Sequence, residues 1–176
     1  MSTLNYSDIL NSLSVNHVNT TSIMPSIITA ITAIVATYLV DTNTVWYQTL
    51  IKPSFNPSPI IFSIAWTIIY ILMAFVGFFD WNIPGMKFIF ILQALLNVAW
   101  VYVFFQMQNP KLAFVIIILQ IVIVTIWMTK STRKWLLVPY LAWLLFAAFI
   151  NYKIMVDNPD HGSQAEVTER NSFIPI

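Results

Sequence analysis

The chain has 176 residues, of which 59% are hydrophobic and only 9% are charged, and its mean hydropathy is +0.77. A soluble domain normally carries about a quarter charged residues, so this composition favours a protein that is solvated by a lipid bilayer. The net charge is +1 and there is no basic block, which argues against nucleic acid as a partner. The chain has no Cys, which excludes disulfides and thiolate chemistry, and its three Gly are too few for a Gly-rich phosphate loop.

Polar tails flank five apolar segments. Residues 1–22 are rich in Ser, Thr and Asn and lack the positive start of a secretory signal. Apolar runs follow at about 23–40, 59–79, 88–105, 112–129 and 135–156, and residues 157–176 are polar again. Helices of about 18 to 22 residues are long enough to cross a bilayer. We therefore predict an all-α integral membrane protein, a five-transmembrane-helix bundle that forms one domain over residues 23–156.

The first apolar segment is rich in Thr and Ala, including Thr29, Thr32, Ala33 and Thr37. Small side chains allow a neighbouring helix or a ligand to approach the backbone closely. The segment is therefore expected to form either a packed helix interface or one wall of a pocket.

The loop that follows, from Asp41 to Pro59, combines prolines with aromatic side chains. Proline fixes its own φ angle and restricts the residue before it, so the loop is expected to be stiff. Such a loop could fold over one end of the bundle as a lid, and its aromatic residues could alternatively form an interfacial belt. The residues expected to shape the lid are Trp46, Lys52, Pro53, Phe55 and Pro57.

Three later segments carry aromatic or polar side chains at helical spacing. In the second segment Phe62, Trp66 and Tyr70 follow one another at four-residue steps and share one helix face. The third segment has Gln93 and Asn97 one turn apart, where they could either join helices or contact a ligand. In the fifth segment Trp143, Ala147 and Asn151 lie at four-residue steps, and a small side chain after a large ring leaves a concavity.

Side chains for acid–base chemistry or metal binding are scarce. His17 and His161 lie in the polar tails, and no acidic side chain falls inside any predicted span. We therefore expect no catalytic acid–base pair and no metal site. The remaining aromatic and amide groups are suited to a flat, apolar ligand.

The loop pattern Trp46-Tyr47-x-x-Leu50-x-Lys52-Pro53-x-Phe55-x-Pro57 resembles the first long loop of the TspO/MBR family, the tryptophan-rich sensory proteins and translocator proteins. Three further stretches agree in order, namely Ala65-Trp66-Thr67 to Tyr70, Gln93 to Trp100, and Pro139 to Trp143 with Asn151-Tyr152. The resemblance covers about residues 46–153, and the first helix weakly. Phe55 stands where many relatives have Trp.

The resemblance implies five tightly packed helices, often as a homodimer, with a pocket that is capped by the first loop. It implies a membrane-embedded binding protein, a sensor or carrier, for porphyrins and similar lipophilic ligands, with no required cofactor. An alternative is an enzyme that slowly degrades porphyrin in light, using Trp66 and Trp143, and a further alternative is a structural partner of another membrane complex. The expected ligand-binding residues are Phe62, Trp66, Tyr70, Asn97, Trp100, Trp143, Ala147 and Asn151.

Overall fold

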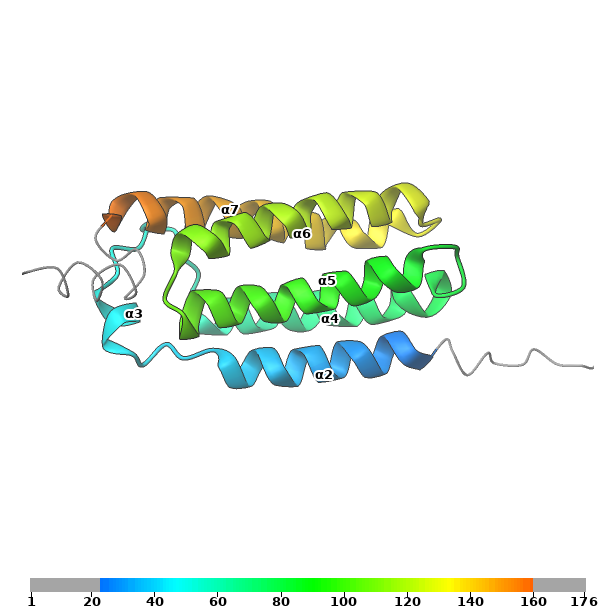
Figure 1. Ribbon diagram of the computed structural model, residues 1–176, viewed down its shortest axis with the longest axis horizontal. Coiled ribbons are helices and arrows are strands. Elements are labelled where there is room, and N and C mark those ends of the chain that lie inside the picture. The colour runs from blue at the N-terminus through cyan, green and yellow to red at the C-terminus, as the bar shows by residue number, and fades with distance from the viewer. Residues whose placement is uncertain (1–22, 160–176) are drawn as a thin grey trace, which may run out of the picture.

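The computed structural model describes residues 23–159, and every regular element in that range is a helix (Figure 1). The predicted tail over 1–22 and residues 160–176, with both histidines, lie outside the described residues. The all-α prediction is confirmed. In chain order the elements are α2 (Met24–Leu39), α3 (Val45–Thr49), α4 (Pro59–Asp80), α5 (Met86–Val101), a π-helical segment (Tyr102–Gln106), α6 (Pro110–Lys130), a 3-10 turn (Lys134–Leu137) and α7 (Val138–Asp157).

Two of the long helices begin with a side-chain cap followed by proline. The Ser58 hydroxyl accepts a hydrogen bond from the Ile61 amide at 3.4 Å, and the Asn109 side chain accepts one from the Leu112 amide at 3.0 Å. Each cap satisfies an amide that has no partner within the helix. Proline at the next position has the φ angle of a helix and lacks an amide hydrogen that would need a partner. The sequence thus fixes where α4 and α6 start.

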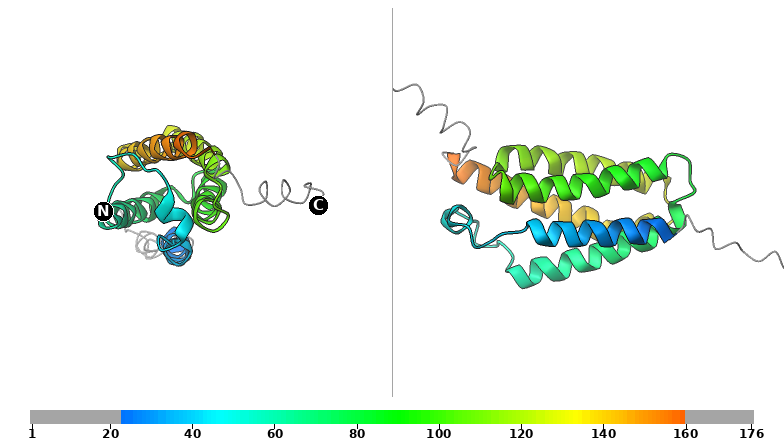
Figure 2. Two further views of the ribbon diagram at one scale, coloured as in Figure 1. Left: turned by 90° about the vertical axis from the view of Figure 1, so that its left-hand side faces the viewer. Right: turned by 60° about the horizontal axis from the view of Figure 1, so that its bottom comes forward.

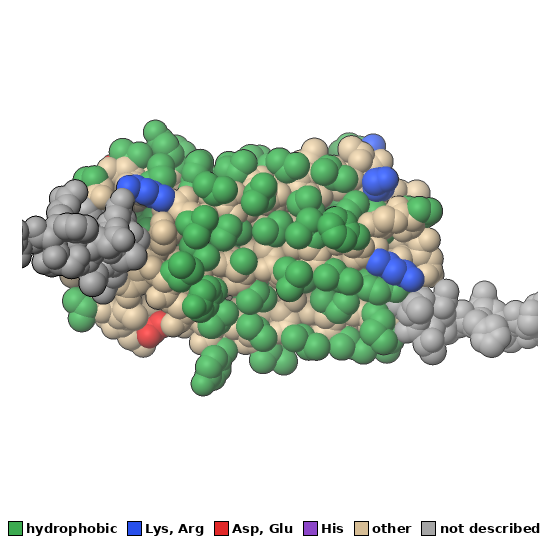
Figure 3. Space-filling model, in the orientation of Figure 1, with side chains coloured by type: hydrophobic (Ala, Val, Ile, Leu, Met, Phe, Trp, Pro, Cys, Tyr) green, Lys and Arg blue, Asp and Glu red, His purple; other side chains and the backbone are tan. Residues whose placement is uncertain are grey.

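Four of the described helical stretches are long and apolar enough to cross a membrane: Pro59–Asp80, Met86–Gln106, Pro110–Lys130 and Lys134–Asp157. The first apolar helix, α2, has 16 residues. At about 1.5 Å per residue α2 extends about 24 Å, which is shorter than the ~30 Å hydrocarbon core of a bilayer. Length therefore supports four of the five predicted crossings. Figure 3 shows hydrophobic side chains along the flank of the bundle, with Lys and Arg at its two ends.

The helices form a ring that is weakly closed on one side. Helix α2 packs against α4 and α5, α5 packs against α6, and α6 packs against α7, whereas α4 and α7 approach each other at few places. Seen from one end, the α2–α4 loop crosses the gap between α4 and α7 (Figure 2). We call this end of the bundle the loop end. The sparse contact between α4 and α7 leaves space inside the ring.

The end of α5 widens into the π-helical segment, where the Met107 amide donates to the Tyr102 carbonyl at 3.0 Å. The wider turn lets the consecutive residues Phe104 and Phe105 both point into the bundle, where each is buried. Trp100 stacks on Phe104 at a centroid distance of 5.5 Å. Three large rings from α5 and its π-helical end therefore gather at the loop end.

The opposite end of the bundle buries a carboxylate. Asp80, the last residue of α4, is 1% exposed, and its Oδ2 accepts a hydrogen bond from Trp127 Nε1 at 2.8 Å. The prediction that no acidic side chain lies inside a span is corrected here, because α4 extends one residue further than the predicted segment. The indole donor on α6 offsets part of the cost of burying the carboxylate.

Candidate ligand-binding cavity

A cavity of about 460 Å³ lies in the loop-end half of the bundle. Its walls come from α2, α4, the end of α5 and α7, and the α2–α4 loop covers it. Seven of the eight residues predicted to bind ligand line this cavity: Phe62, Trp66, Tyr70, Trp100, Trp143, Ala147 and Asn151.

Phe62 lies at the centre of the aromatic lining. Its ring centroid is 5.9 Å from that of Trp143, 6.2 Å from that of Trp66 and 6.4 Å from that of Trp100. One turn deeper, Trp66 is 5.3 Å from Tyr70. The four-residue spacing on α4 places three rings on one face, and α5 and α7 bring two tryptophans towards that face. The result is a wall of aromatic faces and edges drawn from three helices.

Helix α7 contributes space as well as rings. Ala147 follows Trp143 by one turn and lines the cavity, where its short side chain leaves room beside the indole. Asn151 follows by another turn and also joins helices, because its Oδ1 accepts from Trp100 Nε1 at 3.2 Å and its Nδ2 donates to the Pro110 carbonyl at 2.7 Å. The Asn151 amide thus has partners on two other helices and fixes the wall on which it lies.

Two indole donors in the lining have no hydrogen-bond partner among residues 23–159. The Nε1 atoms of Trp66 and Trp143 are buried and make no hydrogen bond among the described residues. A buried polar group without a partner costs about 1–3 kcal/mol. An acceptor atom on a bound molecule could satisfy either indole.

The cavity carries no charge within the part of the chain that the structure describes, because its lining includes no Asp, Glu, Lys, Arg or His. The nearest cation of the loop is Lys52, whose ammonium lies 4.3 Å from the ring centroid of Tyr47 and donates to the Tyr47 carbonyl. Burial lowers the pKa of Lys52, and burial raises the pKa of Tyr47 while the Asn56 side chain lowers it in part. Between residues 23 and 159 no group of His, Asp or Glu side chains could hold a metal ion.

The sequence profile of the TspO/MBR family matches residues 24–156, which run from the first residue of α2 to the last turn of α7. The chain belongs to the TspO/MBR family. A tryptophan-rich protein TspO of Chlorobaculum tepidum is 34% identical over 126 residues, which cover 65% of this chain and 80% of that protein. The translocator protein of Ovis aries is 31% identical over 142 residues, covering 70% of this chain and 81% of that protein. As a member of this family the protein is an integral, multi-pass membrane protein.

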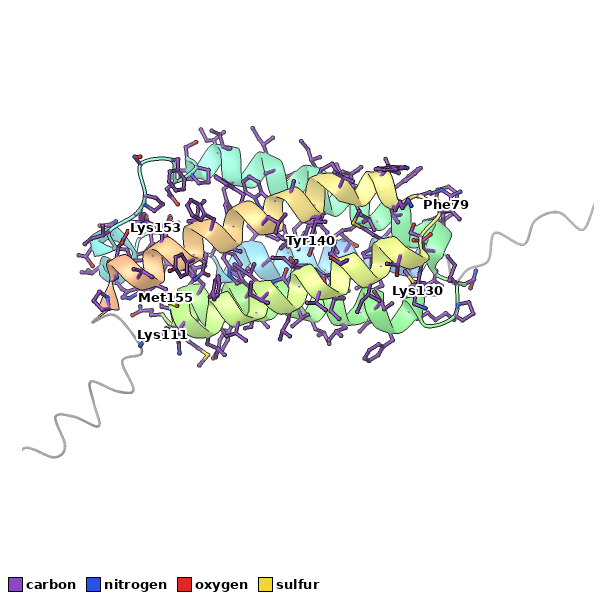
Figure 4. All side chains as sticks on the ribbon, turned by 90° about the horizontal axis from the view of Figure 1, so that it is seen from above. Phe79, Lys111, Lys130, Tyr140, Lys153 and Met155 are labelled. Carbon is purple, nitrogen blue, oxygen red and sulfur yellow. The ribbon has the colours of Figure 1, made fainter. Side chains whose placement is uncertain are left out.

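One predicted site residue of this TspO/MBR chain lies away from the cavity. Asn97 is 1% exposed, and its Nδ2 donates to the Tyr140 hydroxyl at 2.8 Å and to the Gln93 carbonyl at 3.0 Å. Gln93 also donates to the Tyr140 hydroxyl, which in turn donates to Gln120 Oε1 at 3.4 Å. Figure 4 places Tyr140 inside the bundle, between the charged ends marked by Lys111 and Lys130. The amide face of α5 therefore joins α5, α6 and α7, which corrects the predicted placement of Asn97.

The α2–α4 loop covers the cavity mostly with residues other than those predicted to shape the lid. Of the five predicted residues only Pro57 lines the cavity, together with Tyr47 and Asn56 of the same loop. Trp46 packs on Phe104 at a centroid distance of 5.6 Å, and Phe55 packs outside the cavity on α7. Lys52 contacts Tyr47, and Pro53 is half-buried. The predicted residues therefore mainly anchor the loop.

The small residues of helix α2 form both a packed helix interface and one wall of the cavity, the two alternatives that the sequence left open. Thr29 and Thr32 are buried against neighbouring helices, whereas Ala33, Ala36 and Thr37 line the cavity. Helical periodicity alone does not tell the interface residues from the cavity residues, because the distinction depends on where α4 and α5 lie. Phe104 and Phe105 also line the cavity, and helical periodicity does not predict this pair, because consecutive residues do not share one face of a regular α-helix.

Proposed function

We propose that this protein is a membrane-embedded binding protein, a sensor or carrier, for porphyrins and similar flat, lipophilic ligands. The observation that supports the proposal best is the uncharged cavity of about 460 Å³ whose walls are largely aromatic. Small-molecule sites usually enclose about 300–1,000 Å³ and combine apolar walls with a few polar groups. A relative named tryptophan-rich sensory protein and others named translocator protein are consistent with sensing or carrying.

The geometry favours a planar ring over a flexible chain. The ring centroids of Trp66, Trp100 and Trp143 each lie 5.9–6.4 Å from that of Phe62. Each aromatic contact contributes about 0.5–1.5 kcal/mol beyond the area that it buries. The unpartnered indoles of Trp66 and Trp143 suit a ligand that carries hydrogen-bond acceptors, such as ring nitrogens or carboxylate oxygens.

The proposal is tested by titrating the purified protein in detergent with protoporphyrin IX and following tryptophan fluorescence. We expect saturable quenching for the native chain. Replacement of Ala147 by Phe fills space in the lining, and because overpacking costs about 1–3 kcal/mol, the affinity should fall by about tenfold or more. The matched control is Ala142→Phe, which adds the same ring at an exposed position of α7.

The replacements Trp66→Phe and Trp143→Phe each remove an unpartnered donor and should weaken binding several-fold, whereas Trp135→Phe, which alters an exposed indole outside the cavity, should not. Native affinity in Ala147→Phe would show that the ligand binds elsewhere. Absence of saturable quenching by the native chain would refute the proposed function. Repeating the titration under illumination while recording porphyrin absorbance separates a binder, which leaves the ring intact, from a light-dependent enzyme, which consumes it.

A further inference from the structure

We propose that the ligand enters and leaves the cavity sideways from the bilayer, through a seam between α2 and α4, and does not pass under the α2–α4 loop. This inference rests on the proposed function, because it concerns the route to the same cavity. Three routes are available in the geometry: the loop end, the gap between α4 and α7, and the seam between α2 and α4. Side-chain contacts close the first two.

The loop end is closed by a reciprocal pair of hydrogen bonds. The Ile51 amide donates to Asn158 Oδ1 at 2.8 Å, and Asn158 Nδ2 donates to the Ile51 carbonyl at 3.0 Å. Asn158 follows α7 directly, is 6% exposed, and also donates to the Ile154 carbonyl at 2.8 Å. These bonds tie the middle of the loop to the end of α7, across 107 residues of sequence.

Aromatic contacts fasten the same loop on both sides. Trp46 is 9% exposed and packs edge-on against Phe104. Phe55 stacks on Phe149 with a centroid distance of 5.5 Å and an interplanar angle of 14°. Opening the loop would break these ring contacts together with the Ile51–Asn158 bonds. The loop is therefore a fixed cap.

The gap between α4 and α7 is filled by rings. Phe62 of α4 lies 5.9 Å from Trp143 of α7, and Phe55 lies 6.4 Å from Phe146. Trp143 and Phe146 are in turn 5.6 Å apart. A flat ligand would have to displace several of these side chains to pass between α4 and α7.

The seam between α2 and α4 has short side chains. Four lining residues with small side chains repeat at helical spacing on the two helices: Ala33 and Thr37 on α2, and Ser63 and Thr67 on α4. Thr37, Ser63 and Thr67 are exposed on the outside of the protein as well as lining the cavity. A residue that does both marks an opening in the wall.

The two threonine hydroxyl groups at this opening already have partners within their own helices. Thr37 Oγ1 donates to the Ala33 carbonyl at 2.8 Å, and Thr67 Oγ1 donates to the Ser63 carbonyl at 2.8 Å. A threonine hydroxyl that is bonded to the preceding turn has no need of water or of a polar partner. The two threonines can therefore border lipid without an unpaired donor, so the seam suits the passage of an apolar molecule.

Helices α2 and α4 approach each other closely at the far end of the seam. A Cβ atom added at Gly77 of α4 would lie 2.8 Å from Cβ of Pro25 on α2, which shows how closely the two backbones approach there. From that point towards the loop end α2 and α4 move apart (Figure 2). The exposed neighbours of the seam, Ile34, Ile64 and Ile68, are apolar and face the surroundings of the bundle. The opening therefore faces the hydrocarbon of the bilayer, and its ligands are molecules that partition into lipid.

The route is tested in phosphatidylcholine vesicles that contain the protein loaded with protoporphyrin IX, mixed with an excess of empty vesicles. Release is followed by the recovery of tryptophan fluorescence, and uptake by the reverse mixing. Thr67→Trp places an indole ring in the seam. Ile68→Trp places the same ring one residue later, where the side chain faces lipid. We expect Thr67→Trp to slow uptake and release by about tenfold or more, equal to about 1.4 kcal/mol on the barrier, and Ile68→Trp to leave both within about twofold.

A third variant, Asn158→Ala, removes the bonds that hold the loop and should leave the release rate within about twofold of native. Faster release from Asn158→Ala, with native rates in Thr67→Trp, would overturn the proposal and assign the route to the loop. Should Thr67→Trp fail to fold, the pair Thr37→Trp and Tyr38→Trp makes the same comparison on α2. Because the variants are compared by their rates of uptake and release, a result against the seam leaves the proposed function intact as long as the native chain binds the porphyrin. Loss of binding by the native chain would refute both this inference and the proposed function.

Discussion

Replacing Gly77 with Ala tests how tightly three helices meet at the end of the bundle away from the loop. A Cβ atom at this position would lie 2.4 Å from Phe90 Cε2, 2.9 Å from Phe90 Cδ2 and 2.8 Å from Pro25 Cβ. Contacts below 3.0 Å require a neighbour to move. Phe90 is 2% exposed and packs on Trp127 at 5.3 Å, so its ring has little room. Pro25 is a rigid ring, so it cannot yield by changing rotamer.

Two effects of opposite sign act on Gly77→Ala. Helix propensity favours Ala over Gly by about 1 kcal/mol. Overpacking in a buried site costs about 1–3 kcal/mol, and here two neighbours are involved. We expect overpacking to prevail, with a net loss of about 1–2 kcal/mol. At about 2–4 °C per kcal/mol for a chain of this size, the midpoint of thermal unfolding should fall by about 2–8 °C.

The assay is thermal unfolding in detergent, followed by intrinsic tryptophan fluorescence. Phe90→Leu removes the ring atoms nearest to the added Cβ, so Gly77→Ala should destabilise a Phe90→Leu protein less than it destabilises the native protein. A double-mutant cycle of these two changes isolates the contact. A higher unfolding midpoint in Gly77→Ala would mean that helix propensity outweighs the clash, and the reasoning about the close approach would be wrong.

Further predictions concern the core, the pH response, the topology and the assembly. Tyr140→Phe removes the hydroxyl that joins the amides of α5 and α6, so stability should fall by about 1–3 kcal/mol while porphyrin affinity stays native, as thermal unfolding and quenching titrations would show. Binding of a neutral porphyrin ester should stay constant from about pH 6.5 to 8.5, because no carboxylate, imidazole or amine lines the described cavity and burial raises the pKa of Tyr47 further above its ordinary value of 10.0; a titration at several pH values checks this. The basic turn at residues 130–134 predicts an inside location for the end of the bundle at which α2 begins, so Thr132→Cys in this Cys-free chain should resist an impermeant thiol reagent in intact cells and react in lysates. Homodimerisation, which the family resemblance implies, predicts a particle of twice the chain mass after the detergent contribution is subtracted, and a monomeric mass would contradict it.

Repeated spacing within one helix predicts which side chains share a face. Phe62, Trp66 and Tyr70 share a face of α4 whatever surrounds that helix, and the same holds for Trp143, Ala147 and Asn151 on α7. The prolines and capping residues before α4 and α6 likewise set the helix starts locally. These features follow from interactions between residues that are close in sequence.

Other features depend on which surface lies opposite a given face, and only the tertiary structure decides this. Asn97 shares a face with Gln93, but the Tyr140 hydroxyl of α7 lies across from it, so its amide joins helices and does not line the cavity. Asn158 looked like the start of a polar tail, yet it holds a loop residue 107 positions away. Composition and periodicity determined that this protein is a helical membrane protein with aromatic and amide faces. The position of the cavity and its opening between α2 and α4 were set by the tertiary structure, because a helical period specifies which residues share a face and carries no information about the partner that the face meets.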